Sequence, residues 1–421
     1  MKIKLQLILL LTIFFAACSS VNNVADENAT SFRLKIEGND FFIKGMNWTY
    51  FPIGQTYTYS LWNQPDSVIT AVLDYEMSML QEIGVNTIRH YTGIPPKWIT
   101  YIHKNFGIYT VLNHSFGRYG LTLNGKWKGK TDYADEAVKK LLLAEVKQLA
   151  KDYKNTSGLL MYLLGNENNY GLSWEGAETE NIPNEDEATS IAARNLYKLF
   201  NDATVLMKQI DSTHKICICN GDLQYLDIII EECDDIDVLG VNIYRGESFE
   251  GAFADVAKKW NIPVLFTEFG ADAFDNKQLI EDQKSQAYYL LNNWKEIYEN
   301  ADGLGAANNS IGGFTFHFSD GWWKAGQTKN LSLHDSTASW NNGGYIDDYI
   351  PGKNNISEEW FGVCAKDTAS NELFTPLKPR EAFYVLKEIH KKDPYQIQKS
   401  DITIPKYFER ISIDKAIKKS K

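Results

Sequence analysis

Two glutamates stand at equivalent places in two short motifs of the chain. Glu167 lies in Leu164–Asn168 (LGNEN), and Glu268 lies in Phe266–Gly270 (FTEFG). Each follows an apolar, β-prone run and comes just where that run gives way to a loop containing glycine. Two carboxylates at the ends of different strands can act in one reaction, in which a protonated carboxyl gives a proton to a leaving oxygen and an ionised one attacks carbon. The pair therefore predicts cleavage at an acetal carbon, as in a glycosidic bond.

Segments expected to be strands and helices alternate through most of the chain. The expected strands are Phe41–Trp48, Thr87–Tyr91, Tyr109–Ser115, Leu159–Glu167, Lys215–Gly221, Val238–Tyr244, Pro263–Gly270 and Gly312–Ser319. The expected helices are Val68–Ile83, Pro96–Asn105, Asp135–Tyr153, Glu187–Ile210, Tyr225–Cys233, Phe249–Trp260, Gln278–Asn300 and Pro379–Lys391. Such a series, with near-continuous apolar strands, predicts an α/β fold: a single-domain (β/α)8 TIM barrel rather than an open sheet.

Two of the expected loops at the C-terminal ends of the strands are long and aromatic. The loop after the first strand carries Tyr50, Phe51, Tyr57, Tyr59 and Trp62. The loop after the eighth strand, Asp320–Lys378, carries Trp322, Trp323, Trp340, Tyr345, Tyr349, Trp360 and Phe361. Active sites of barrels lie at this face. The loops are therefore interpreted either as a cleft wall that stacks on sugar rings or as a self-packed cap over the barrel mouth.

Four segments taken together resemble a known enzyme family. Phe41–Asn47 (FFIKGMN), Asn86–Arg89 (NTIR), Leu164–Glu167 (LGNE) and Thr267–Gly270 (TEFG) are similar to the catalytic barrel of glycoside hydrolase family 2, within clan A of the retaining (β/α)8 glycosidases. A weaker likeness is to β-1,3-glucanosyltransferases. The resemblance covers nearly the whole chain after its N-terminal leader. It implies a retaining glycosidase that cleaves β-linked glycans by double displacement, through a glycosyl-enzyme intermediate.

The resemblance also implies roles for individual residues. Glu167 falls on the acid/base position, and Glu268 falls on the nucleophile. Asn166 falls on the residue that binds the sugar 2-hydroxyl, and Arg89 and Tyr244 fall on residues that donate hydrogen bonds to the nucleophile. In a retaining enzyme the two carboxyl groups are expected to lie about 5–5.5 Å apart.

Further candidates for substrate contacts are aromatic or imidazole side chains. His114 is a candidate for a sugar hydroxyl at the cleavage site, although a lone histidine is more often a hydrogen-bonded wall residue. Phe316 falls where family 2 often has a tryptophan platform, and Trp322 or Trp323 could swing in to serve instead. Trp174, shortly after the acid/base motif, is expected to add another aromatic wall. Two departures from the family are noted. Family 2 enzymes normally carry β-sandwich domains before the barrel, whereas fewer than thirty residues separate Cys18 from the first expected strand. Phe316 stands in place of the family's tryptophan, which weakens any transfer of substrate specificity.

The first residues of the chain are expected to direct its export. Lys2 and Lys4 precede an apolar stretch, Leu5–Ala17, that is too short to span a bilayer comfortably. The sequence around Cys18 (FAACSS) resembles a bacterial lipobox, in which the cysteine becomes the lipidated first residue. The alternative is an ordinary signal peptide with a chance cysteine. Since no acidic residue follows Cys18 directly, we expect an exported lipoprotein of the outer membrane, on either its periplasmic face or the cell surface.

The chain is thus divided into four parts by sequence. The expected parts are a signal peptide at 1–17, a lipidated tether at 18–31, the glycosidase barrel at 32–398 and a C-terminal tail at 399–421. The four later cysteines, Cys217, Cys219, Cys233 and Cys364, are expected to be buried free thiols, with the first two on one face of a strand.

Composition and net charge limit the classes of molecule that the protein is expected to bind. The 421 residues are 44% hydrophobic and 23% charged, which is typical of a folded protein. A net charge of −11 argues against nucleic acid and against an anionic membrane, so that only the lipid anchor is expected to contact lipid. It favours an oligosaccharide or polysaccharide without charge. No cofactor and no metal are expected, because no glycine-rich phosphate loop and no metal-ligand spacing occur.

Other functions remain open at this point. A sugar hydroxyl could replace water, which would make the protein a β-glucan transglycosylase acting through the same site. Alternatively, the barrel could be a non-catalytic glycan-binding lipoprotein. The sequence leaves open the sugar, the linkage, endo or exo cleavage, and the oligomeric state.

Overall fold

The computed structural model describes residues 31–91, 93–172, 187–305, 307–324, 326–368 and 374–418. By its internal contacts the chain divides into Met1–Ser31 and Phe32–Lys421, and all of the described helices and strands belong to the second unit. Among the residues described, no helix is both long enough and apolar enough to cross a lipid bilayer.

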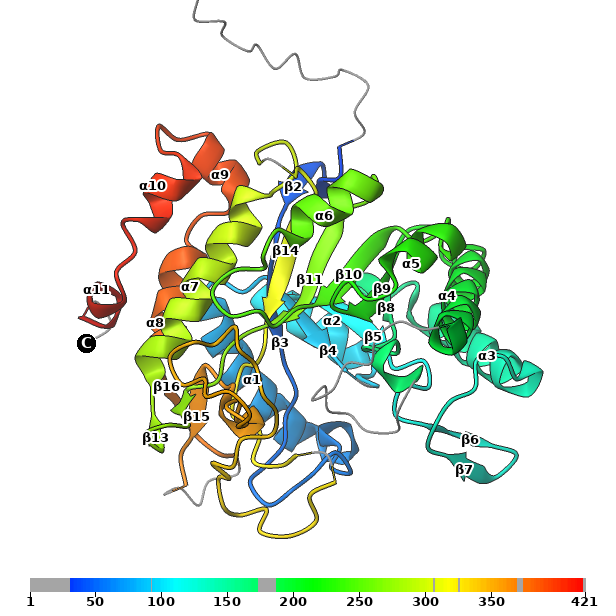
Figure 1. The fold of residues 1–421 in the computed structure, drawn as a ribbon, viewed down its shortest axis with the longest axis horizontal. Coiled ribbons are helices and arrows are strands. Elements are labelled where there is room, and N and C mark those ends of the chain that lie inside the picture. Colours follow the sequence, from blue (N-terminus) through cyan, green and yellow to red (C-terminus); the bar gives the residue numbers. More distant parts are fainter. Residues whose placement is uncertain are drawn as a thin grey trace, which may run out of the picture. The chain divides into compact units, whose positions relative to one another are not determined.

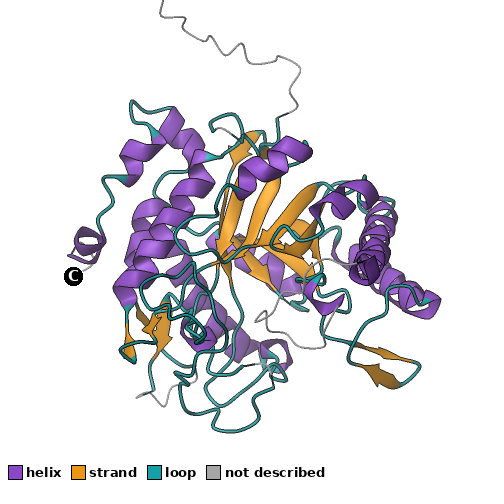
Figure 2. Cartoon of the chain, viewed as in Figure 1, coloured by secondary structure: helices purple, strands orange, loops and turns teal. Residues whose placement is uncertain are grey.

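Eight parallel strands close into a barrel (Figures 1 and 2). Around the barrel they are β3 (Ile43–Asn47), β4 (Thr87–His90), β5 (Tyr109–His114), β8 (Leu159–Leu164), β9 (Lys215–Gly221), β10 (Val238–Asn242), β11 (Val264–Phe269) and β14 (Ser310–Thr315), which pairs back with β3. Each strand overlaps one of the expected segments. The predicted (β/α)8 barrel is confirmed.

Helices follow the strands and flank the barrel (Figure 2). They are α1 (Asp66–Glu82), α2 (Pro96–Phe106), α3 (Glu136–Tyr153), α4 (Glu187–Lys208), α5 (Leu226–Glu232), α6 (Ala252–Lys259), α7 (Gln283–Glu299) and α8 (Glu381–Ile389). Residues at the ends of these helices account for where some of them begin and end. The α2 helix has proline in its first turn and ends at Gly107, whose φ of 69° suits glycine, and the side chain of Asp135 caps α3.

Several short elements were not expected from the sequence. Antiparallel hairpins are formed by β1 (Leu34–Ile36) with β2 (Asn39–Phe41), β6 (Leu121–Leu123) with β7 (Lys126–Lys128), β12 (Phe274–Asp275) with β13 (Ile280–Glu281), and β15 (Cys364–Lys366) with β16 (Leu377–Pro379). Strands of two or three residues are too short to show alternation. Phe41 therefore belongs to the first hairpin and not to the first barrel strand. After α8 follow α9 (Pro394–Gln398), α10 (Ile404–Phe408) and α11 (Ile413–Lys418), and the last two contact α7 and α8.

Apolar side chains form a large cluster and a smaller one linked to the barrel strands. The large cluster joins side chains of the strands to those of the surrounding helices. The smaller one includes Val111, Met161, Leu163, Cys217 and Cys219, all of which are buried. Cys217 and Cys219 thus share a face of β9, and all four described cysteines are buried free thiols, as predicted.

Part of the long loop after β14 is packed against itself. Trp322 is buried, and its ring stacks on His334 at a centroid distance of 4.9 Å. His334 stacks in turn on Trp360 at 3.9 Å. At the base of the loop, Arg380 donates to both carboxylate oxygens of Asp320, at 2.6 and 2.7 Å. Part of this loop therefore has the character of the self-packed cap that was one of the two interpretations.

Candidate active site

The turn after β8 has an unusual backbone that places Glu167. Gly165 has a φ of +83°, and a Cβ atom there would lie 2.6 Å from Asn168 Oδ1 and 2.7 Å from Phe200 Cζ. The side chain of Asn168 accepts a 2.8 Å hydrogen bond from the backbone of Asn166. Glu167 itself has a φ of +57°, a left-handed conformation that a glutamate adopts only when its surroundings hold it there. The turn thus holds Glu167 by packing and hydrogen bonds.

Three donors converge on the carboxylate of Glu268, which lies in β11 and is 6% exposed. Arg89 Nη1 donates to Oε1 at 2.7 Å, from a side chain that is fully buried. The Tyr91 hydroxyl donates to the same oxygen at 2.7 Å. The Tyr244 hydroxyl donates to Oε2 at 2.9 Å. Both oxygens are held by charged or hydroxyl donors, so the orientation of the carboxylate is fixed.

Glu167 has the opposite environment. In the part of the chain that the structure describes, its carboxylate accepts one hydrogen bond, from Asn242 Nδ2 to Oε1 at 3.0 Å. Burial and the charge of Glu268 raise the pKa of Glu167 to about 7, against smaller lowering effects of Asn242, Arg118 and Arg89. A carboxyl group with this pKa carries its proton for much of the time at neutral pH. Glu167 is therefore suited to donate a proton.

A hydrogen-bond network joins the surroundings of the two carboxylates. Arg89 Nη2 donates to Asn166 Oδ1 at 2.7 Å and to Asn113 Oδ1 at 2.8 Å. Asn242 Nδ2, which contacts Glu167, also lies 3.1 Å from Asn166 Oδ1. The amide nitrogen of Asn166 donates to the hydroxyl of Tyr119 at 2.6 Å. Asn166 is thus the residue at which the two halves of the site meet.

The structure brings together the core of the predicted site and adds to it. Glu167, Glu268, Asn166, Arg89 and Tyr244 lie in one network. The additional members are Tyr91, Asn242, Asn113 and Tyr119. Alternation along strands could have found two of them, because residues two apart point to the same face. Tyr91 follows Arg89 by two positions, and Asn242 precedes Tyr244 by two.

The expectation for His114 is corrected. Its neighbour Asn113 contacts Arg89, so the side chain of His114 leaves the opposite face of β5. There His114 Nε2 lies 3.4 Å from Glu145 Oε2 on α3, and its Nδ1 accepts a hydrogen bond from the backbone of Phe116 at 3.2 Å. His114 is a hydrogen-bonded wall residue, and its position does not support a sugar contact.

Two aromatic rings lie directly beside the site. The ring of Phe316 is half-buried, with its centroid 6.3 Å from that of Tyr244. Trp340, from the long loop after β14, is also half-buried and lies 6.0 Å from Tyr244 in an edge-to-face contact. Tyr244 donates to Glu268, so each ring is one residue away from that carboxylate. The role of Phe316 as a sugar platform stays a prediction, and Trp340 was named in the sequence only as a loop residue.

The structure describes two of the three tryptophans predicted to contact substrate, and it places them in different surroundings. Trp322 is 6% exposed and stacked inside its loop, so the expectation that it could serve as a platform is not supported. Trp323 is half-buried between the two long aromatic loops, with Phe51 at 5.5 Å and Tyr57 at 5.9 Å. Trp174 lies outside the described residues.

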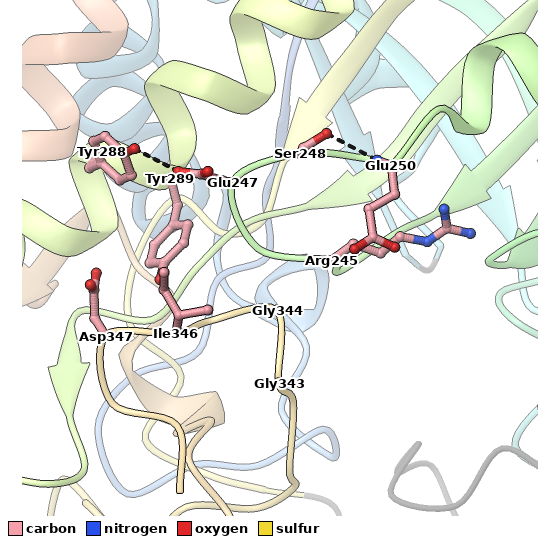
Figure 3. Close-up of a pocket in the computed structure, with 10 residues that line it drawn as sticks. All are labelled: Arg245, Glu247, Ser248, Glu250, Tyr288, Tyr289, Gly343, Gly344, Ile346 and Asp347. Atoms are coloured by element: carbon pink, nitrogen blue, oxygen red, sulfur yellow. Dashed lines mark hydrogen bonds between the residues drawn. The ribbon is translucent and has the colours of Figure 1, made fainter.

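A cavity of about 570 Å³ has Arg245, the residue after Tyr244 in the chain, in its wall. Its walls come from the loop after β10, from α7 and from the loop after β14 (Figure 3). Neither Glu167 nor Glu268 lines it. Some polar groups in its walls have partners, such as the Tyr288 hydroxyl, which donates to Glu247 at 2.6 Å. The cavity is therefore separate from the glutamate pair. Within the described ranges, no group of three or more His, Cys, Asp or Glu side chains is arranged to hold a metal ion.

Comparison with known proteins supports the fold. No protein-family model matches the chain, and no curated protein matches it. Several solved structures do match the chain. A Bacteroides uniformis β-glucuronidase matches with a TM-score of 0.56 and 12% identity, over 85% of this chain and 36% of the other. A Dictyoglomus thermophilum β-D-glucuronidase matches at 0.53 and 15% identity, over 86% and 53%.

A third solved structure gives the same picture. A family GH2 β-galacturonidase from Eisenbergiella tayi matches with a TM-score of 0.53 and 12% identity, over 86% of this chain and 53% of the other. The chain thus spans between a third and just over half of the length of these three enzymes. At this level of identity the likeness shows a shared (β/α)8 barrel.

Proposed function

We propose that this protein is a retaining β-glycoside hydrolase with a catalytic barrel of the glycoside hydrolase family 2 type. The observation that carries the proposal is the contrast between the two glutamates. Glu268 is held by Arg89, Tyr91 and Tyr244 as an oriented carboxylate. Glu167, tied to the same network through Asn242, has a pKa raised to about 7. Two carboxyl groups in such different environments are what glycoside hydrolysis with retention requires.

The first step of the proposed reaction joins the sugar to the protein. An oxygen of Glu268 attacks the anomeric carbon while the bond from that carbon to the leaving oxygen breaks. The proton of Glu167 passes to the leaving oxygen, so that the departing sugar leaves as an alcohol. The site is then a glycosyl ester of Glu268 with Glu167 ionised. Tyr244 and Tyr91 hold the carboxylate so that the attacking oxygen faces the sugar.

The second step releases the sugar. Glu167, now ionised, takes a proton from a water molecule, whose oxygen attacks the anomeric carbon as the bond to Glu268 breaks. Two inversions at this carbon restore its original configuration. In the transition states Asn166 is placed to bind the 2-hydroxyl, because its amide is fixed by Arg89 and Tyr119. If a sugar hydroxyl takes the place of water, the same steps give transglycosylation.

The solved structures add support from outside the chain. Those with a similar barrel are named as β-glucuronidases and a GH2 β-galacturonidase. The proposal takes from them a carbohydrate substrate and β-glycosidase activity. It also keeps the expected export of the protein, as an outer-membrane lipoprotein with Cys18 as the lipidated residue. Labelling of cells with a fatty-acid analogue tests that part, since Cys18→Ala should abolish the label.

The activity is tested with a panel of aryl β-glycosides and β-linked oligosaccharides, with products separated by chromatography. The wild-type protein should release sugar from at least one of them, and Glu268→Gln should not. Glu409→Gln is the matched control, because Glu409 is an exposed glutamate near the C-terminus. Products longer than the substrate would reveal transglycosylation. Absence of cleavage across the panel, with retained glycan binding, would instead identify a non-catalytic binding protein.

A further inference from the structure

The loop between β5 and α3 contains a basic segment in an otherwise acidic protein. Arg118–Lys130 (RYGLTLNGKWKGK) has four basic residues and no acidic one, whereas the whole chain has a net charge of −11. The segment includes the β6–β7 hairpin. Figure 1 shows this hairpin on the same side of the barrel as the loops that follow β3 and β14. The basic segment therefore lies on the catalytic face.

The start of the segment touches the catalytic network. Tyr119 accepts the 2.6 Å hydrogen bond from Asn166, whose Oδ1 accepts from Asn242 Nδ2 at 3.1 Å. The same Asn242 nitrogen donates to Glu167, so two side chains link Tyr119 to the acid/base. The Tyr119 side chain is nevertheless 49% exposed. Because Glu167 protonates the leaving oxygen, the departing part of the substrate lies on the Glu167 side. Tyr119 is thus at the boundary between the site of cleavage and the leaving group.

An exposed tryptophan follows directly along the same surface. The Trp127 ring lies against Gly120, where a Cβ atom would be 2.6 Å from Cζ2, and the residue is 65% exposed. The hairpin that carries it is held in place. Leu121 is buried, and the Thr131 hydroxyl donates to the Gly117 carbonyl across the base of the loop at 2.5 Å. Because Trp127 packs on Gly120, the residue next to Tyr119, the two exposed rings can contact successive parts of one ligand.

The charges around Trp127 indicate what kind of ligand this is. Lys126, Lys128 and Lys130 are exposed, and none of the ion pairs found among the described residues includes them. A single exposed tryptophan is ordinary on a protein surface. An exposed tryptophan amid three lysines that have no carboxylate partner among the described residues, next to a glycosidase centre, fits a sugar ring with anionic substituents. The negative net charge does not oppose this, since screening limits each charge to about 8 Å.

We propose that Arg118–Lys130 forms a subsite for the leaving-group side of an anionic glycan. The indole of Trp127 stacks on a sugar ring, and the neighbouring lysines bind carboxylate or sulfate groups on that sugar or the next. The inference rests on the proposed function, because the leaving-group side is defined by Glu167. It replaces the expectation, drawn from net charge alone, that the substrate is a neutral polymer.

Binding to three derivatives of one polymer tests the inference. Carboxymethyl cellulose, cellulose sulfate and hydroxyethyl cellulose share a backbone and differ in charge, so they separate carboxylate, sulfate and neutral ligands. Dissociation constants are measured by affinity electrophoresis of the full chain carrying Glu268→Gln, which removes turnover. We expect one or both anionic polymers to bind more tightly than the neutral one, with an affinity that falls as salt rises.

Substitutions in the hairpin locate the binding. Trp127→Ala should weaken binding of the anionic polymer about tenfold, the loss expected for one well-packed aromatic contact. Lys126→Glu combined with Lys128→Glu should weaken it further and remove the salt dependence. Lys399→Glu combined with Lys406→Glu is the control, because these exposed lysines lie in the α9–α10 region. All of these positions are exposed, so the variants should unfold at the wild-type temperature.

Equal binding of all three polymers, or equal affinity of the hairpin and control variants, would overturn the inference. The inference would also be overturned if the hairpin variants lost binding to vesicles of phosphatidylcholine with phosphatidylserine but kept binding to every polymer. That result would identify the hairpin as a membrane-binding element. The outcome is separable from the proposed function. Anionic binding without cleavage of any glycoside would contradict the function alone, and cleavage without anionic binding would contradict the subsite alone.

Discussion

Tyr91 donates a 2.7 Å hydrogen bond to Oε1 of Glu268, the same carboxylate oxygen that Arg89 contacts. The hydroxyl also lies 3.0 Å from Asn47 Oδ1. Together with Tyr244 on the other oxygen, Tyr91 completes a set of donors that leaves little freedom to the carboxylate. Preorganised donors of this kind lower the barrier because they need not reorient during the reaction.

Removal of this hydroxyl should impair catalysis more than folding. We expect Tyr91→Phe to lower kcat about 100-fold, the usual loss for one preorganised donor. Tyr101→Phe provides a matched control, because the Tyr101 hydroxyl also donates to a carboxylate, Asp74, but on the surface helices α1 and α2. Steady-state kinetics on the best substrate of the panel measures the effect. Equal rates for both variants would show that Tyr91 does not act through Glu268.

The effects of substituting Arg89 and Glu268 on the free energy of unfolding should depend strongly on each other. Arg89→Met leaves a carboxylate buried without its cation, and we expect the free energy of unfolding to fall by about 3–5 kcal/mol. Glu268→Gln added to Arg89→Met removes the buried charge, so the double variant should be more stable than Arg89→Met alone. Urea unfolding of the wild type and the three variants measures this cycle. Additive losses would indicate that the two side chains are not energetically paired.

Activity should depend on pH through Glu167. Its pKa is raised to about 7 by burial and by the charge of Glu268. Since the protonated form donates to the leaving oxygen, kcat/KM should be high below this pKa and fall as pH rises through about 7. The hydrogen bond from Asn242 lowers this pKa, so Asn242→Ala should move the alkaline limb to higher pH. A limb that stays in place or moves to lower pH would contradict the assignment of Glu167 as the acid.

The barrel could be predicted because its pattern is regular along the chain. Buried strands of four to seven residues alternate with amphipathic helices, and each unit shows this period locally. The two glutamates could be located for the same reason, since a motif at the end of a strand has a defined place in a barrel. Asn242 and Tyr91 were within reach of the same reasoning, had strand alternation been applied to Arg89 and Tyr244.

Other parts depend on contacts that no local pattern reports. Trp322 is buried because His334 stacks on it, and Trp360 stacks on His334 in turn. Both partners are distant along the same loop, and nothing in the residues around Trp322 indicates these contacts. Trp340 contacts Tyr244 because of the course that the same loop takes, and this course cannot be read from the residues around Trp340. By contrast, the basic residues of Arg118–Lys130, on which the proposed anionic subsite rests, can be read from the sequence itself. Net charge favoured a neutral glycan because it averages over the whole chain.

Covalent trapping tests the central claim most directly. The protein would be incubated with 2-deoxy-2-fluoro β-glycosyl fluorides of the common hexoses and hexuronic acids, which slow the second step more than the first. Mass spectrometry of the intact protein and of its peptides then locates any attached sugar. The account predicts one added glycosyl group, carried by Glu268 and absent from Glu268→Gln. An adduct on another residue, or turnover to a product of inverted configuration without any adduct, would contradict it.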